Sequence, residues 1–275
     1  MASPTEITVN QLSRLIGLTG APVIVDVRID DDFAADARLI PASQRRAHTD
    51  VAHWAPALAG DRAVVVCHRG KKLSQGVAAL LRADGIAAET LAGGFEAWAD
   101  AGLPAIRPER LTNRDPDGRT RWVTRARPKI DRIACPWLIR RFVDPQAVFM
   151  FVAAAEVEAV AERFDAAPFD IVDTFWSHRG EHCTFDVMLA EFGLQTEALA
   201  HLARIVRGAD TNRPELAPEA AGLLAASLGL SRMYRDDLEQ LDASLPLYDA
   251  LYRWCRDATA ERHDWPPPGS KPGAA

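Results

Sequence analysis

Residues 63–72 read Ala63-Val64-Val65-Val66-Cys67-His68-Arg69-Gly70-Lys71-Lys72. The first four residues are apolar, which is typical of a buried strand. A short polar loop follows, and apolar residues then recur at helical spacing up to Ala83, before the stop signal Gly85. The stretch therefore predicts a strand, a tight loop and a helix, the unit that repeats in parallel sheets flanked by helices.

The rest of residues 1–108 fits the same pattern. The run Val23-Ile24-Val25-Asp26-Val27 reads as a second buried strand. The run Thr8-Val9-Asn10-Gln11 is a capping box, in which the Thr hydroxyl and the Gln amide satisfy free N–H groups where a helix begins. We predict an α/β fold for this region, with its chemistry at the carboxyl ends of the parallel strands.

Length and composition bound the remaining possibilities. The chain has 275 residues, 48% hydrophobic and 25% charged, which is enough apolar material for two globular domains. Its formal net charge of -6 argues against nucleic acid as a partner. The first residues show no signal-peptide pattern, and no apolar run reaches the ~18 residues of a membrane helix. We expect a cytoplasmic protein with reduced thiols and no membrane partner.

The chain has four scattered cysteines, Cys67, Cys135, Cys183 and Cys255. None forms a CxxC pair, so the sequence indicates neither a disulfide framework nor a thiolate zinc finger. Cys67 has the strongest chemical context. Backbone N–H groups and the amino end of the following helix surround a residue in this position and favour its thiolate, as do the cations Arg69, Lys71 and Lys72. Gly70 lets the loop curl tightly.

Two chemistries use a cysteine in such a loop: sulfur transfer and phosphate-ester hydrolysis. The hydrolases need an arginine six positions after the cysteine to bind the phosphate oxygens, and that position is Leu73 here. The sequence therefore favours sulfur transfer, with a persulfide on Cys67.

Several motifs of residues 1–108 together resemble a single rhodanese domain: Val25-Asp26-Val27-Arg28, Leu39-Ile40-Pro41-Ala42, the Cys67 loop, Leu91-Ala92-Gly93-Gly94-Phe95-Glu96-Ala97-Trp98 and Gly102-Leu103-Pro104. The resemblance implies a thiosulfate-type sulfurtransferase that needs no cofactor and passes sulfur from Cys67 to a thiol acceptor. It also implies that the loop residues bind the substrate anion: His68, Arg69, Gly70, Lys71 and Lys72. The segment Arg38-Leu39-Ile40-Pro41-Ala42-Ser43 departs from the Gly-His-Ile-Pro-Gly-Ala that the family often has. The competing interpretation is a binding module that retains an unused thiol.

The composition changes after this region. Residues 109–128 are rich in arginine and turn formers and poor in apolar residues, which predicts a linker. Residues 129–265 contain several helical stretches, so we expect a second, mainly helical domain, either α or α+β. The proline-rich residues 266–275 predict a flexible tail.

One cysteine of the second domain lies in an apolar helical pattern. Pro136 suits the first position of a helix, which would put Cys135 at the cap, where free N–H groups favour a thiolate. Cys135 also shares one face with Leu138, Ile139 and Phe142, which is the pattern of a buried core cysteine. We favour burial and keep Cys135 as a second candidate sulfur acceptor.

A polar cluster reads Ser177-His178-Arg179-Gly180-Glu181-His182-Cys183-Thr184 and precedes a helical stripe. His178 and His182 are candidate ligands of a divalent metal, which Glu181 or Cys183 would complete. Cys183 is also the more attractive candidate acceptor of sulfur from Cys67. Histidines that are hydrogen-bonded in a structural loop account for the pattern equally well.

Residues 125–257 resemble the C-terminal domain of the chromate-resistance protein ChrB. The resemblance rests on the segment from Asp131 to Phe142, on the His178 cluster, and on Arg207-Gly208-Ala209-Asp210-Thr211 and Leu247-Tyr248-Asp249-Ala250-Leu251-Tyr252. It implies a link to chromate, as an oxyanion that the domain binds or senses. Our leading hypothesis is a sulfurtransferase coupled to this domain. The alternatives are a chromate-responsive regulatory protein in which the rhodanese domain only binds, and a metal-dependent enzyme centred on His178 and His182.

Overall fold

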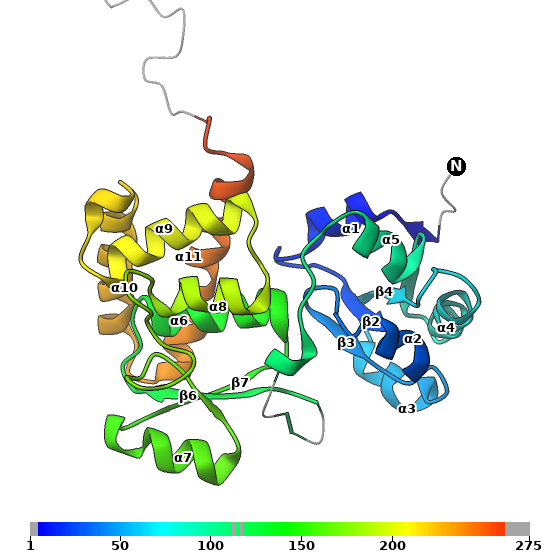
Figure 1. The fold of residues 1–275 in the computed structure, drawn as a ribbon, viewed down its shortest axis with the longest axis horizontal. Coiled ribbons are helices and arrows are strands. Elements are labelled where there is room, and N and C mark those ends of the chain that lie inside the picture. The colour runs from blue at the N-terminus through cyan, green and yellow to red at the C-terminus, as the bar shows by residue number, and fades with distance from the viewer. Residues whose placement is uncertain (1–4, 112–113, 116–117, 262–275) are drawn as a thin grey trace, which may run out of the picture.

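Five parallel strands form the first sheet of the computed structural model, which describes residues 5–111, 114–115 and 118–261. Their order across the sheet is β1-β5-β4-β2-β3 (Figure 1). The strands are β1 (Glu6–Ile7), β2 (Val23–Asp26), β3 (Ser43–Arg45), β4 (Arg62–Val66) and β5 (Ala87–Leu91). The predicted tail, residues 266–275, lies outside the described residues.

Helices cover both faces of this sheet: α1 (Val9–Leu15), α2 (Asp30–Ala35), α3 (Val51–Trp54), α4 (Lys72–Ala83) and α5 (Gly94–Asp100). Successive side chains of a strand point to opposite faces, so Val64 and Val66 pack in the core with α1 and α5, whereas Val65 packs with α3 and α4. The predicted α/β fold is confirmed, as are both predicted strands, the helix after the Cys67 loop and the capping box of Thr8 with Gln11.

The carboxyl-terminal region is mainly helical but contains a three-stranded parallel sheet of order β7-β6-β8. Its strands are β6 (Arg121–Arg125), β7 (Val148–Val152) and β8 (Ala167–Pro168). Its helices are α6 (Asp131–Leu138), α7 (Val157–Phe164), α8 (Thr184–Phe192), α9 (Glu197–Asp210), α10 (Ala220–Met233) and α11 (Asp237–Asp257). A π-helical turn, Ile139–Val143, continues α6. The architecture is therefore α+β.

The structure differs from the linker prediction at the carboxyl end of residues 109–128, because β6 lies there and is the central strand of the second sheet. Its inner residues Trp122, Val123 and Thr124 are buried. Arg121 and Arg125 flank this short buried run and give the segment its linker-like composition.

The two regions share one apolar core. A single cluster of buried side chains includes Leu12 and Trp98 of the first region and Trp137 and Phe142 of the second. The N–H of Ala42 donates to the carbonyl oxygen of Phe142 at 2.7 Å. No helix among the described residues is both long and apolar enough to cross a membrane.

Candidate functional site

The Cys67 loop connects β4 to α4 and is held against the start of α5 (Figure 1). The N–H groups of Phe95 and Glu96 donate to the carbonyl oxygens of Cys67 and His68, both at 3.0 Å. Gly70 has a φ of +65°, and a Cβ on it would lie 2.3 Å from the carbonyl oxygen of Leu91. The loop therefore keeps its shape because glycines allow two backbone segments to touch.

The thiol of Cys67 lies at the base of this loop, and the residue is 5% exposed. Its Sγ is 3.1 Å from the hydroxyl oxygen of Ser74, which also lies 3.0 Å from the carbonyl oxygen of Lys71. A serine hydroxyl has one proton, so Ser74 can donate it to the carbonyl oxygen or, when Cys67 is a thiolate, to the sulfur.

Positive groups surround the same loop. In the described part of the chain, the N–H groups of residues 68–72 donate no hydrogen bond to other protein groups. They lie at the amino end of α4, where the helix dipole adds positive potential. Lys71 and Lys72 are exposed, and Arg69 is exposed while it pairs with Glu96 at 3.5 Å. The arrangement suits a small anion next to Sγ.

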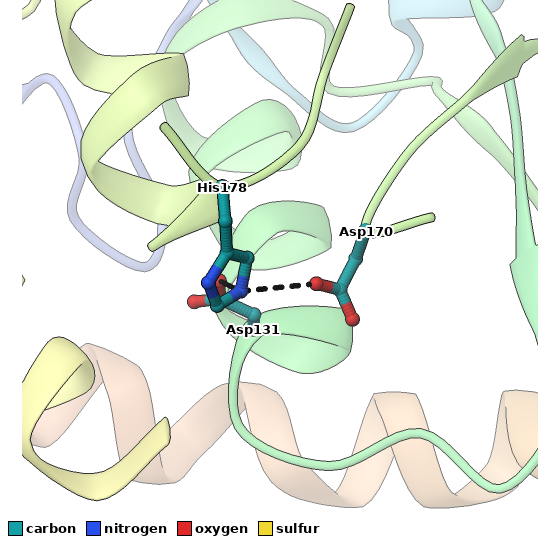
Figure 2. Close-up of side chains that lie close together, drawn as sticks. All are labelled: Asp131, Asp170 and His178. Atoms are coloured by element: carbon teal, nitrogen blue, oxygen red, sulfur yellow. Dashed lines mark ion pairs between the residues drawn. The ribbon is translucent and has the colours of Figure 1, made fainter. Parts of the chain in front are cut away.

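A second polar cluster lies in the carboxyl-terminal region, where one imidazole meets three carboxylates. Nε2 of His178 is 3.5 Å from Asp131, 3.4 Å from Asp170 and 3.3 Å from Asp210 (Figure 2 shows the first two). Close contact with these carboxylates, above all with Asp131, raises the pKa of His178 to about 12. Complete burial raises the pKa of Asp131 to about 7, although its contact with His178 opposes that shift.

The structure does not bring the side chains of the two predicted metal ligands, His178 and His182, together at one metal site. Gly180 has a φ of +59°, and Arg179 and His182 bond to each other's backbone in a tight turn between the two histidines. As a result Nδ1 of His182 lies 3.1 Å from Nη1 of Arg207. Glu181 pairs instead with Arg213. Among the described residues, the group that could hold a metal is Asp131, Asp170 and His178.

The two candidate sulfur acceptors of this region are completely buried. Cys135 lies inside α6, which begins at Asp131, so the expectation that it caps a helix is wrong and burial is its actual role. Cys183 does precede a helix, as the residue that caps α8. Burial raises the pKa of both thiols well above the usual value, and the charge of Asp131 adds to the shift. Both therefore stay neutral thiols, which are poor nucleophiles.

Sequence reasoning missed Asp131 and Asp170 as candidate ligands. Asp131 stands immediately before the apolar pattern of α6, where an acidic residue is common simply because it stabilises a helix start. Asp170 follows the two-residue strand β8, which the sequence did not reveal. Asp210, which belongs to the motif Arg207-Gly208-Ala209-Asp210-Thr211, also contacts His178.

Two known families match separate regions of the chain. The model described as "Rhodanese-like domain" matches residues 8–101, and the model described as "ChrB, C-terminal domain" matches residues 122–255. The chain joins a rhodanese-like domain to a ChrB C-terminal domain.

Among curated proteins, Protein ChrB of Cupriavidus metallidurans is 36% identical over 146 residues. The match covers 52% of this chain and 43% of that protein, so the chain spans less than half the length of this relative.

Two solved structures are similar to the rhodanese-like domain. A rhodanese-related protein from Thermoplasma volcanium is 20% identical, with a TM-score of 0.33, over 37% of this chain and 96% of that one. A thiosulfate sulfurtransferase from Pseudomonas aeruginosa is 24% identical, with a TM-score of 0.34, over 38% of this chain and 20% of that one.

Proposed function

We propose that the rhodanese-like domain is a thiosulfate-type sulfurtransferase that carries a persulfide on Cys67. One observation supports this most directly: Sγ of Cys67 lies in a loop whose N–H groups, from residues 68–72, have no hydrogen-bond partner within the described part of the chain and can therefore bind an anion. The position six residues after Cys67, which the phosphate-ester hydrolases fill with arginine, is Leu73, the second residue of α4, and it packs against the core. The geometry therefore suits a sulfur anion better than a phosphate ester.

The reaction would have two half-reactions. The Cys67 thiolate attacks the outer sulfur of thiosulfate, the sulfur–sulfur bond of thiosulfate breaks, and sulfite leaves with the bonding electron pair. The loop N–H groups stabilise the resulting anionic persulfide, and the cations Arg69, Lys71 and Lys72 attract the incoming dianion. A thiol, or cyanide in an assay, then takes the outer sulfur and regenerates the thiolate. No step needs a cofactor.

The acceptor in this proposal is a thiol from outside the chain, because Cys135 and Cys183 are both buried. A cytoplasmic location, where small thiols are reduced and abundant, suits such an acceptor. Two arginines of the ChrB C-terminal domain, Arg179 and Arg207, already pair with Glu191 and Asp186, so carboxylates of the chain balance their charge.

The test is formation of thiocyanate from thiosulfate and cyanide by the full chain. We expect Cys67→Ser to lower the rate by about a thousandfold or more, since it removes the nucleophile. Cys255→Ser is the matched control, because Cys255 also packs in the core but lies at the end of α11. Mass spectrometry after thiosulfate alone should find one added sulfur on the wild type and on Cys255→Ser. Equal turnover by the wild type and Cys67→Ser would refute the proposal.

A further inference from the structure

Three side chains that are far apart in the sequence converge in the ChrB C-terminal domain. Asp131 is the first residue of α6, Asp170 follows β8, and His178 lies in the segment that leads into α8 (Figure 2). One ligand atom from each lies within 4.8 Å of the other two. This convergence is independent of the Cys67 loop, which belongs to the other domain.

The distances suit a shared cation better than a shared proton. Nε2 of His178 is 3.5 Å from Oδ2 of Asp131 and 3.4 Å from Oδ1 of Asp170. A charge-assisted hydrogen bond is shorter, about 2.7–2.9 Å, and one N–H can point at only one acceptor. Ligand atoms that each lie about 2.1 Å from a metal ion are separated from one another by roughly 3.0–3.4 Å.

The carboxylate of Asp131 gives a second, independent indication. The residue is 0% exposed and its side chain faces the imidazole (Figure 2). Oδ2 accepts the N–H of Thr184 at 2.6 Å, whereas Oδ1 has no hydrogen-bond partner within the described residues. A buried carboxylate oxygen without a partner is unfavourable. A cation held by both oxygens of the Asp131 carboxylate would supply that partner.

Neighbouring groups hold the ligands in place, as the second layer of a metal site does. Thr184 donates its hydroxyl proton to Oδ1 of Asp170 at 3.0 Å. Arg132 lies 3.2 Å from Oδ2 of Asp170 and balances that charge, so Asp131 and Asp210 remain to balance a divalent ion. The His178 side chain is 41% exposed, which leaves a path for the ion and an open side for a further ligand.

We propose that Asp131, Asp170 and His178 bind one divalent cation, with Asp210 as the adjacent charge-balancing carboxylate. Two carboxylates and one imidazole are the ligands that Mn²⁺ accepts, and Mn²⁺ has little affinity for thiols. Mn²⁺ is therefore the probe of choice for a chain with four free cysteines.

The experiment titrates Mn²⁺ into the full chain after treatment with a chelator, with free Mn²⁺ measured by electron paramagnetic resonance. We expect one Mn²⁺ per chain for the wild type and an affinity at least about tenfold lower for both His178→Ala and Asp170→Asn. His182→Ala is the matched control, since His182 lies four residues from His178 and contacts Arg207 instead. It should bind like the wild type.

Thermal unfolding with and without Mn²⁺ is the second measurement, and it also shows that each variant is folded. Mn²⁺ should raise the midpoint of the wild type and of His182→Ala, because a ligand that binds only the native state stabilises it. It should leave Asp170→Asn unchanged, which keeps the test informative if His178→Ala does not fold. Absence of Mn²⁺ binding to the wild type, or wild-type binding by both ligand variants, would overturn the proposal.

Discussion

At the residue scale, two glycines decide the shape of the Cys67 loop. A Cβ on Gly94 would lie 2.3 Å from the carbonyl oxygen of Cys67 and 2.4 Å from the N atom of Gly70. Both glycines have positive φ, +65° for Gly70 and +64° for Gly94. The backbone contact that supports Cys67 therefore requires a glycine at position 94.

We predict that Gly70→Ala destabilises the chain by at least about 2 kcal/mol, from the left-handed conformation and the overlap with Leu91 together. It should also lower thiocyanate formation, because the loop cannot keep its shape. Gly76→Ala is the control, since Gly76 lies inside α4 with open space around its Cα, and alanine there should stabilise by roughly 0.5–1 kcal/mol. Denaturant unfolding of the two variants measures the difference. Equal stability of the two would contradict this account of the loop.

A buried ion pair explains another motif of the first domain. Asp26 and Arg28 are both almost completely buried and lie 2.6 Å apart. The Arg28 guanidinium also stacks on Phe95 at 3.8 Å and donates to the carbonyl oxygens of Asp36 and Arg38. The motif residues around Asp26 and Phe95 thus hold the loops of the first domain in place.

At the element scale, α11 is attached to the end of α6 and to the first domain through Asp249. Its carboxylate accepts from Trp137 and from two nitrogens of Arg141, each at 2.8 Å. It also accepts from the hydroxyl of Thr19 in the rhodanese-like domain at 3.2 Å. Burial opposes ionisation, but the hydrogen bonds from Arg141 and Trp137 outweigh it and lower the pKa of Asp249.

We predict that Asp249→Ala costs about 2–4 kcal/mol, because it leaves Trp137 and Arg141 without their acceptor. Asp242→Ala is the matched control on the same helix, since Asp242 is 68% exposed and pairs with Arg140 at 2.8 Å. It should cost less than about 1 kcal/mol. Urea unfolding at neutral pH measures both values, and similar costs for the two would refute the assignment.

The pH dependence of this contact follows from the sign of the shift. A carboxylate whose pKa is lowered in the native state stabilises the fold above its unfolded pKa, near 3.9, and loses that contribution as the pH falls through its native pKa. The difference between wild type and Asp249→Ala should therefore be constant from neutral pH to about pH 5 and shrink below about pH 4. Urea midpoints measured across this range check it. A difference that grew as the pH fell would have the wrong sign.

The elements also show which parts of the fold could be predicted. Strands β2 and β4 each contain a run of at least three consecutive apolar residues, and α4 has apolar residues at helical spacing, so the sequence pattern locates all three elements. The sequence does not reveal β6 and β8, because β6 buries only three residues between its terminal arginines and β8 buries only one. Because β8 positions Asp170, the contact between Asp170 and His178 could not be predicted from the sequence. The residues of the Cys67 loop are contiguous in the chain, so that loop could be predicted.

At the scale of the whole molecule, the two domains form one structural unit. The face of the first sheet that α1 and α5 cover belongs to the same apolar cluster as the helices of the ChrB C-terminal domain. Phe142 is central to the contact: its ring lies against Gly17, where a Cβ would be 2.2 Å from Cζ, and it packs on Trp137 and Tyr252. Domains that share a core are expected to unfold together.

We predict a single cooperative transition in calorimetry for the wild type. Phe142→Ala should destabilise the whole chain by about 3–5 kcal/mol and lower the midpoint by roughly 10 °C, because it opens a cavity in the shared core. Phe164→Ala is the control, since that ring is 52% exposed at the end of α7 and contributes little to burial. Two separate wild-type transitions, of which Phe142→Ala shifts only one, would show that the domains are energetically independent. If Phe142→Ala shifts one common transition, the two domains unfold together. Any change in the His178 cluster that stabilises the second domain then also stabilises the Cys67 loop against unfolding.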